Sequence, residues 1–260
     1  DVLFFDEQVF ALFSGQATTN DGHAPNVLKL SNIQLSQFPT QQECIKKKLV
    51  MPHVRVLDVC HFMNTKSDTL QAIPLVFPNA DTLYIDSLED LLGGKCAGKV
   101  IINSVKKLHV LNLKDECCNR YLSYLKRDYF PNLAELYITE ELECGMDKLS
   151  DNISAFGHEI QVLQIPLSET LYSTERIKKL TQLIPNVKQL YFTRDNQLGS
   201  LFDNAIETES LAALYELQHL EVLVIELELS EPFFFKLFEQ HEAKACPKLK
   251  VLIENLQFIS

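Results

Sequence analysis

A short apolar phrase that returns along the chain constrains the fold more than any other feature of the sequence. It reads PHVRVLDV from Pro52, PNADTLYI from Pro78, PNLAELYI from Pro131, PNVKQLYF from Pro185 and PKLKVLIE from Pro247. Copies without the proline are VKKLHVLNL from Val105, HEIQVLQI from His158 and QHLEVLVI from Gln218, and PNVLKLSN from Pro25 is a weaker first copy. Self-similarity of this kind is typical of architectures built from stacked repeats.

The copies share one central leucine, and aligning them on it gives intervals of 25 to 33 residues. The aligned leucines are Leu30, Leu57, Leu83, Leu111, Leu136, Leu163, Leu190, Leu223 and Leu252. Around each leucine the apolar residues follow an L-x-x-L-x-L pattern, as in Leu133, Leu136 and Ile138. Because side chains alternate along a strand, the second and third of these positions lie on one side of a short strand and face a core.

Helical spacing separates the predicted strands. Apolar residues recur at the period of a helix in three segments, namely Leu122, Leu125 and Tyr129; Leu149, Ile153 and Phe156; and Ile177, Leu180 and Ile184. Thr40 and Glu43 form a capping box that predicts the start of a further helix. Each copy is therefore predicted to be a strand plus a helix, and it can bury its apolar face only against its neighbours.

In this period and motif, the chain resembles leucine-rich-repeat proteins of the ribonuclease-inhibitor-like and F-box leucine-rich-repeat type, over roughly residues 25–256. The resemblance implies an α/β solenoid, or horseshoe, with an inner parallel β-sheet and outer helices, in a single domain spanning 1–260. It would hold about nine repeats of about 27 residues. Those families usually place Asn or Cys three residues after the last leucine of the motif. Here those positions hold Phe62, Leu88, Glu116, Glu141, Ser168, Asp195 and Glu228, so the repeats are degenerate.

One residue in each copy is predicted to point outward, between the second and third core positions. From the second copy onward these residues are Asp58, Tyr84, Asn112, Tyr137, Gln164, Tyr191 and Val224. Stacked strands would place them in a row with about 4.8 Å per step. Tyrosine offers a large contact area and a hydroxyl group, which favours a role as an interface anchor. Strands are also enriched in tyrosine without any binding role, so both interpretations stay open.

Acidic residues outnumber basic ones beside this row. The flanking residues are Asp86, Asp115, Glu135, Glu140 and Glu226 against Lys114 and Arg194. Such a surface would attract a basic segment of a partner, although a solvated acidic rim gives the same pattern. The candidate partner-binding residues are Asp58, Tyr84, Asp86, Asn112, Tyr137, Glu140, Gln164, Tyr191 and Arg194.

Charge and composition narrow the function classes. The formal net charge of −11 disfavours binding to a phosphate backbone, so we expect no nucleic-acid partner. No apolar run reaches the roughly 18 residues that a membrane-spanning helix needs, and we expect no membrane association. The seven cysteines contain no C-x-x-C pair and are odd in number, which favours a reducing compartment, cytoplasmic or nuclear.

Two stretches suggest catalysis, and both have simpler interpretations. GGKCAGK, from Gly93, nearly matches a phosphate-binding loop, but it does not directly follow a strand, and Val100 stands where the loop needs Ser or Thr for Mg²⁺. Cys60 and His61 hold the residue types of a thiol nucleophile and its base, yet adjacent residues at a strand end point apart. The histidines and cysteines lack ligand spacing. We therefore predict no catalytic residues, no cofactor and no metal site.

The predicted function is a non-catalytic scaffold that binds a partner protein on the concave face of the solenoid. The resemblance to F-box leucine-rich-repeat proteins implies a narrower role, the substrate-recognition subunit of a cullin-RING ubiquitin ligase with ligase-core subunits as partners. That role needs box helices. Residues 1–24 hold an amphipathic segment that is either the tail of such a box or, as we favour, an end cap on the first repeat. The alternative function is an enzyme with a nucleotide site at GGKCAGK or a thiol-dependent site at Cys60.

Overall fold

The structure is a computed structural model of the chain. The residues that it describes are 27–29, 41–60, 73–85, 101–111, 125, 127–139, 153–154, 156–167, 174–194, 213–225 and 250–253, with backbone only at 27–29, 41, 43, 47, 167, 194 and 250–253. The chain divides into two compact units. Unit 1 comprises residues 1–112 and 123–133, and unit 2 comprises residues 113–122 and 134–260.

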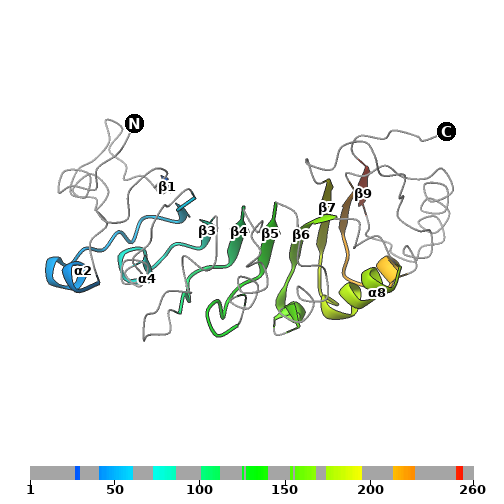
Figure 1. The fold of residues 1–260 in the computed structure, drawn as a ribbon, viewed down its shortest axis with the longest axis horizontal. Coiled ribbons are helices and arrows are strands. Elements are labelled where there is room, and N and C mark those ends of the chain that lie inside the picture. Colours follow the sequence, from blue (N-terminus) through cyan, green and yellow to red (C-terminus); the bar gives the residue numbers. More distant parts are fainter. Residues whose placement is uncertain are drawn as a thin grey trace, which may run out of the picture. The chain divides into compact units, whose positions relative to one another are not determined.

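Unit 1 contains four described strands that pair in parallel and in chain order (Figure 1). They are β1 (Val27–Lys29), β2 (Val56–Asp58), β3 (Thr82–Ile85) and β4 (Lys107–Val110). Helix α2 (Gln41–Lys47) lies between β1 and β2 in the sequence, and α4 (Ile73–Val76) lies between β2 and β3. Parallel neighbours need such crossovers, because the chain must return to the same edge before each new strand.

Unit 2 contains five described strands, and the pairing is again parallel and in chain order. They are β5 (Glu135–Ile138), β6 (Val162–Leu167), β7 (Gln189–Arg194), β8 (Val222–Ile225) and β9 (Lys250–Ile253). The 3-10 helix η2 (Gly157–Glu159) precedes β6, α8 (Thr174–Leu183) precedes β7, and a helical turn at 213–215 precedes β8.

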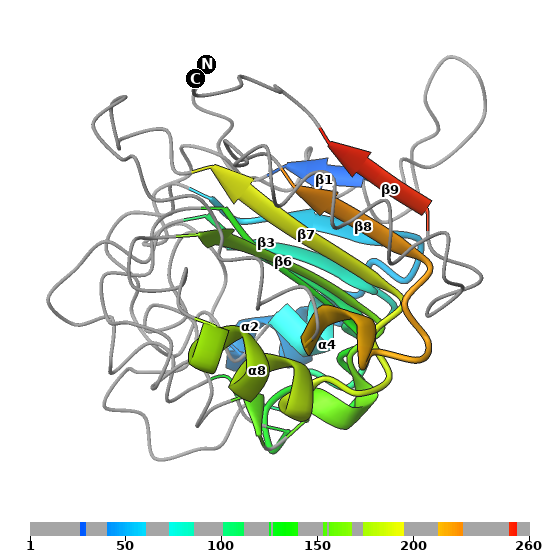
Figure 2. The same ribbon diagram turned by 90° about the vertical axis from the view of Figure 1, so that its right-hand side faces the viewer.

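In each unit the described helices lie on one side of the strands (Figure 2). Helix α8 shows why. Ile177 and Leu180 are buried, whereas Lys178, Lys179 and Gln182 are exposed on the other side, so the amphipathic pattern turns one stripe toward the strands. This confirms the helix predicted from Ile177 and Leu180.

The other three predicted helices had different outcomes. The helix predicted from Leu122, Leu125 and Tyr129 was wrong at its described end, because residues 127–129 form a turn. Helix α2 begins at Gln41, directly after the predicted cap Thr40, which lies outside the described residues. Ile153 and Phe156 are buried as their spacing indicated; Ile153 is helical, the residues directly before it lie outside the described ranges, and η2 follows. Leu122 and Leu149 also lie outside the described residues.

A stripe of leucines, one from each of seven strands, lies within the core of its unit. Leu57, Leu83 and Leu108 pair in register in unit 1, and Leu136, Leu163, Leu190 and Leu223 do so in unit 2. All seven are at most 1% exposed. Burying a leucine side chain stabilises by about 1.5–3 kcal/mol relative to leaving it in water, so this stripe makes a large contribution to holding consecutive copies together.

A four-residue turn closed by a backbone hydrogen bond leads into six of the described strands, namely β2, β3, β5, β6, β7 and β8. The amide of its last residue donates to the carbonyl of its first, for example Ala80 to Phe77 at 3.2 Å and Val187 to Ile184 at 3.1 Å. The same bond forms from Val54 to Met51, from Leu133 to Phe130, from Ile160 to Gly157 and from Leu220 to Leu217. Proline suits the second position because its fixed φ matches the turn. The first and last residues of each turn are buried, which explains why the repeat has the sequence pattern apolar-Pro-Asn-apolar.

Asparagines in these turns connect consecutive copies. The Asn79 amide donates to the Pro52 carbonyl at 2.8 Å, Asn132 to Asn103 at 2.7 Å, and Asn186 to His158 at 2.8 Å. In each case the acceptor is the second turn residue of the preceding copy. These asparagines therefore join consecutive copies at the entrance to the strands.

Backbone bonds repeat with the same step. The carbonyl of the residue two positions before the central leucine accepts from two successive amides of the next copy. Gln161, for example, accepts from Lys188 at 2.8 Å and from Gln189 at 3.0 Å. The carbonyls of Arg55, Asp81, Ala134 and Lys188 behave in the same way. Because these bonds use only the backbone, they hold the stacking of copies even where the side chains have diverged.

The structure corrects the alignment of the fourth copy. Leu108 pairs with Leu83, so the predicted central residue Leu111 was wrong by three positions. The turn explains the difference, because it ends at Val105 and the central leucine follows the last turn residue by three positions in the neighbouring copies. Leu108 and Val110 are fully buried, whereas Leu111 is half-buried.

The first and last copies also differ from the predicted alignment. Leu28 rather than Leu30 pairs with Leu57, and Val251 rather than Leu252 pairs with Leu223. Leu28 and Leu30 are two residues apart and therefore lie on the same face of the strand. Alternation alone does not determine which of them is the central leucine. The last copy contains three apolar residues in succession, Val251, Leu252 and Ile253. This run has no alternation of polar and apolar residues, so the sequence does not indicate which of them face the core.

Candidate functional site

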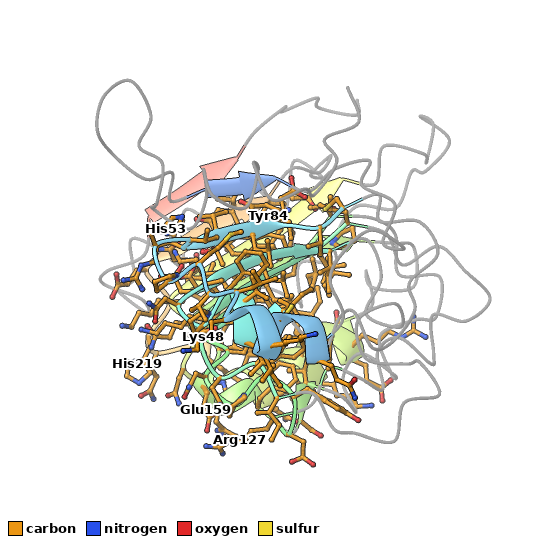
Figure 3. The ribbon with its side chains drawn as sticks, turned by 90° about the vertical axis from the view of Figure 1, so that its left-hand side faces the viewer. Lys48, His53, Tyr84, Arg127, Glu159 and His219 are labelled. Carbon is orange, nitrogen blue, oxygen red and sulfur yellow. The ribbon has the colours of Figure 1, made fainter. Side chains whose placement is uncertain are left out.

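The outward row of unit 1 consists of Asp58, Tyr84 and His109, which pair in register on β2, β3 and β4. The rings of Tyr84 and His109 stack with centroids 4.0 Å apart and an interplanar angle of 11°. Asp58 Oδ1 accepts a hydrogen bond from the Cys60 amide at 3.0 Å. Tyr84 lies on the side of the strands away from α2, whereas Lys48 lies beside that helix (Figure 3).

His109 takes the place that the sequence alignment assigned to Asn112. The shift of three residues in the fourth copy moves His109 into the row, and Asn112 lies outside the described residues. The turn ending at Val105 was the signal that could have found His109, because the outward residue follows the last turn residue by four positions in the other copies.

The outward row of unit 2 consists of Tyr137, Gln164, Tyr191 and Val224, again in register. The Tyr137 hydroxyl donates to Glu135 Oε2 at 3.0 Å, and the Tyr191 hydroxyl donates to Gln189 Oε1 at 2.8 Å. Each acceptor lies two residues earlier on the same strand and therefore on the same face. Both rings are thus tied along their strands, and their orientation is set before any partner arrives.

A second row runs beside this one through Glu135, Val162, Gln189 and Val222. Val162 is 8% exposed, and Val224 in the first row is 6% exposed. The tyrosines and Gln164 are half-buried. The described face of unit 2 is therefore a mixed surface of apolar and aromatic groups with amide and carboxylate groups between them, as in the buried centre of many protein interfaces.

The remaining predicted site residues are placed less completely. Arg194 ends β7, and only its backbone is described. Asp86 and Glu140 lie outside the described residues, as do the flanking Lys114, Asp115 and Glu226. The structure brings Asp58 next to Tyr84, and Gln164 between Tyr137 and Tyr191. Because the first pair belongs to unit 1 and the other residues to unit 2, each row is a separate candidate.

Of the two stretches with catalytic interpretations, only Cys60 lies within the described residues. Cys60 is 3% exposed, which fits the interpretation as a small core residue, since a reactive thiol must be accessible. His61 and the whole GGKCAGK stretch lie outside the described residues. No set of three or more His, Cys, Asp and Glu side chains in the described ranges could hold a metal ion. None of the helices in the described ranges has the length and hydropathy needed to cross a membrane.

His53 is a half-buried polar residue outside the two rows. It stands in the turn before β2, at the position that Asn79 and Asn186 occupy in later copies. Its Nε2 atom is buried and has no hydrogen-bond partner. Desolvation lowers the pKa of His53, because burial disfavours the charged imidazolium. His53 therefore stays neutral over a wider pH range than an exposed histidine does.

Comparison of the structure with solved structures identifies the fold. The leucine-rich-repeat-containing protein LegL7 from Legionella pneumophila matches 92% of this chain and 78% of its own, with a TM-score of 0.54 and 15% sequence identity. The chain has a leucine-rich-repeat fold. Human 5T4, a trophoblast glycoprotein also named Wnt-activated inhibitory factor 1, matches 80% of this chain and 72% of its own, with a TM-score of 0.45 and 13% identity. No family model matches the chain, and no curated protein matches its sequence.

Proposed function

We propose that this protein is a non-catalytic scaffold that binds a partner protein on the face of its strands opposite the helices. The observation that carries the proposal is the row of Tyr137, Gln164 and Tyr191, in which both tyrosine hydroxyls are hydrogen-bonded within their own strands. Leucine-rich-repeat solenoids present extended surfaces of this kind.

The energetic argument rests on preorganisation. A tyrosine that binds a partner contributes a large apolar area and loses few rotamers, because it has only two side-chain torsions. Here the bonds to Glu135 and Gln189 restrict those torsions in the unbound protein. The entropic cost of ordering the side chain is therefore met during folding, and more of the contact energy is available for binding.

The charge beside Tyr137 on the face of unit 2 favours a partner with a basic segment, because the Glu135 carboxylate lies next to that ring. In unit 1, Asp58 lies beside Tyr84, but Lys29 pairs with Asp58 in register and Lys107 stands on the neighbouring row, so neither sign of charge dominates there. A carboxylate next to an aromatic ring attracts a Lys or Arg side chain, which can contact the ring with its stem or its cation while it pairs with the carboxylate.

A narrower role is substrate recognition for an F-box-type ubiquitin ligase, and affinity capture of partners from a cell lysate tests it. Ligase-core subunits should then co-purify with the protein, and they should stay bound when the tyrosines are replaced, because a core subunit docks on a different element from the substrate. If no core subunit is recovered in a capture that does recover other partners, the ligase role is excluded and the scaffold role is retained.

The scaffold role is tested by affinity capture with matched variants. The triple variant Tyr84→Ala, Tyr137→Ala, Tyr191→Ala removes one ring from the proposed face of unit 1 and two from that of unit 2. The control, Lys178→Ala with Gln182→Ala, changes two exposed residues on the opposite side of unit 2. We expect the triple variant to lose at least about tenfold in partner capture, since interface anchors contribute about 2 kcal/mol or more each. The control should capture as the wild type does. A folded triple variant that retains every partner rejects the proposal.

A further inference from the structure

The spacing of the two tyrosines in unit 2 points to the shape of the partner. Tyr137 and Tyr191 lie two strand steps apart with Gln164 between them, which separates their positions by about 9.6 Å at 4.8 Å per step. A polyproline II helix rises about 3.1 Å per residue and has three residues per turn, so it presents equivalent side chains every 9.3 Å or so. We propose that Tyr137, Gln164 and Tyr191 bind a proline-rich polyproline II segment that crosses the strands. This inference rests on the proposed function and names the partner's chemistry at the same face.

Other secondary structures match the spacing less well. An extended β-strand presents side chains on one face every 6.6 to 6.8 Å or so. If one side chain contacts the first tyrosine, the next on that face lies short of the second tyrosine and the one after it lies beyond. An α-helix reaches a similar azimuth after seven residues, about 10.5 Å, and its roughly 10 Å diameter needs a groove to lie in. The polyproline II repeat differs from the tyrosine spacing by only about 0.3 Å.

The hydrogen-bonding groups of the row fit the same partner. Proline residues have no amide N–H, so a proline-rich segment offers carbonyl acceptors and apolar ring faces. Tyr137 and Tyr191 already donate their hydroxyl hydrogens within the protein, and their rings supply flat apolar contacts. The Gln164 side chain makes no hydrogen bond within the described part of the chain, and its amide is a donor for a peptide carbonyl between the two rings.

The position of the Glu135 carboxylate predicts which end of the proline-rich segment lies near Tyr137. The Glu135 carboxylate stands at the Tyr137 end of the row and accepts the Tyr137 hydroxyl, whereas the neutral Gln189 stands in the same relation to Tyr191. A basic residue of the segment therefore belongs at the Tyr137 end. Aromatic-lined surfaces are a recurring way to recognise proline-rich segments.

Fluorescence anisotropy with three labelled peptides of equal length tests the inference on the full chain. The probe is one arginine followed by nine prolines. The second peptide replaces the prolines by alternating glycine and serine, which keeps the charge and removes the polyproline II conformation. The third is an alanine-rich helical peptide with one arginine. We expect the proline probe to bind at least about tenfold more tightly than the other two, because its backbone is already ordered.

Variants separate the contributions of the row. Tyr137→Ala, Tyr191→Ala and Gln164→Ala should each weaken binding of the proline probe at least fivefold or so, as expected for anchors of a small interface. Gln182→Ala on α8 should leave it unchanged, and Glu135→Gln should weaken the arginine-containing probe but not plain polyproline. Equal binding of the glycine-serine or helical peptide, no saturable binding of the proline probe, or unchanged binding by the tyrosine variants would each overturn the inference. If partner capture still depends on the tyrosines in that case, the scaffold role stands and only the proline-rich partner is rejected.

Discussion

Three asparagine side chains, Asn79, Asn132 and Asn186, join a copy of the repeat to the one before it. Each occupies the third position of the turn that leads into a strand, and each donates to a backbone carbonyl one repeat earlier. The bonds satisfy carbonyls of exposed turns, where regular secondary structure offers no partner. These degenerate repeats lack asparagine after the strands. Three of them have an asparagine in the turn before the strand instead.

The contribution of this contact can be measured at Asn186. Asn186→Ala removes the bond to the His158 carbonyl, and we expect the free energy of unfolding to fall by about 1 kcal/mol, the usual net value of one hydrogen bond. His219 occupies the equivalent position in the next copy and is exposed. His219→Asn places a donor one repeat from the Pro185 carbonyl, and it should raise stability by up to the same amount. Urea denaturation gives both values, and equal stability of Asn186→Ala and wild type would show that the bond contributes nothing.

For two threonines in unit 2, the same substitution by valine is expected to change stability in opposite directions. Thr193 Oγ1 is buried without a hydrogen-bond partner, whereas Thr181 Oγ1 donates to the Lys178 carbonyl at 2.9 Å. Valine has the same shape without the hydroxyl. Thr193→Val should therefore stabilise the protein by about 1 kcal/mol, because an unsatisfied buried hydroxyl is removed, and Thr181→Val should destabilise it by a similar amount. Thermal unfolding monitored by circular dichroism distinguishes them, and a loss of stability in Thr193→Val would mean that its hydroxyl is satisfied.

At the level of elements, packing between consecutive crossovers depends on a glycine. Gly157 begins η2, and the end of α8 packs against it within unit 2. A Cβ atom at Gly157 would collide with the backbone carbonyl of Leu183 and would lie 3.0 Å from Ile153 Cγ2. A backbone carbonyl cannot rotate away as a flexible side chain can. The lack of a side chain is thus what allows the end of α8 to approach the preceding copy.

Gly157→Ala tests this contact. We expect it to lower the free energy of unfolding by about 1–3 kcal/mol, as overpacked core substitutions do, even though alanine favours helical backbone more than glycine does. Gln182→Ala on the exposed side of α8 should change stability by less than about 0.5 kcal/mol and serves as the control. Denaturant unfolding followed by circular dichroism gives the comparison. A Gly157→Ala variant as stable as the control would show that α8 shifts without cost.

At the scale of the whole molecule, the chain divides into two compact units, each built from strands that pair with their sequence neighbours. In repeat architectures of this kind stability is approximately a sum of terms for single repeats and nearest neighbours. The effect of removing core volume should therefore be largest near the altered copy. Leu57 in unit 1 and Leu190 in unit 2 are both fully buried and hold the same position in their copies.

Leu57→Ala and Leu190→Ala test this locality by hydrogen exchange. Each should cost about 2–5 kcal/mol, the range for a leucine cut back to alanine in a core. We expect Leu190→Ala to speed amide exchange most in β6, β7 and β8, and Leu57→Ala to do so most in β2 and β3. Equal acceleration over both units in either variant would show that the chain unfolds as one cooperative body.

Sequence reasoning recovered the strands well because their signal is local. Leu57, Leu136 and Leu190 could be recognised from the spacing of apolar residues around a turn, and the α8 stripe of Ile177 and Leu180 follows the helical period. It failed at Leu111, where several apolar residues in one run allow two alignments, and it therefore missed His109 beside Tyr84. The hydroxyl bonds of Tyr137 and Tyr191 were also beyond it, because a sequence pattern predicts which face a residue takes but not its rotamer.

The repeating phrase alone was enough to predict a parallel α/β solenoid, since burial of one apolar face per copy leaves stacking as the available way to remove that face from water. The order of residues could not determine which side chains on the open face touch. That depended on backbone register, and register follows from hydrogen bonds between copies that are about 27 residues apart, such as those from Lys188 and Gln189 to Gln161. A shift of one to three residues leaves the apolar composition of a copy nearly unchanged but replaces every outward neighbour, so only the assembled strands identify the stack of Tyr84 on His109.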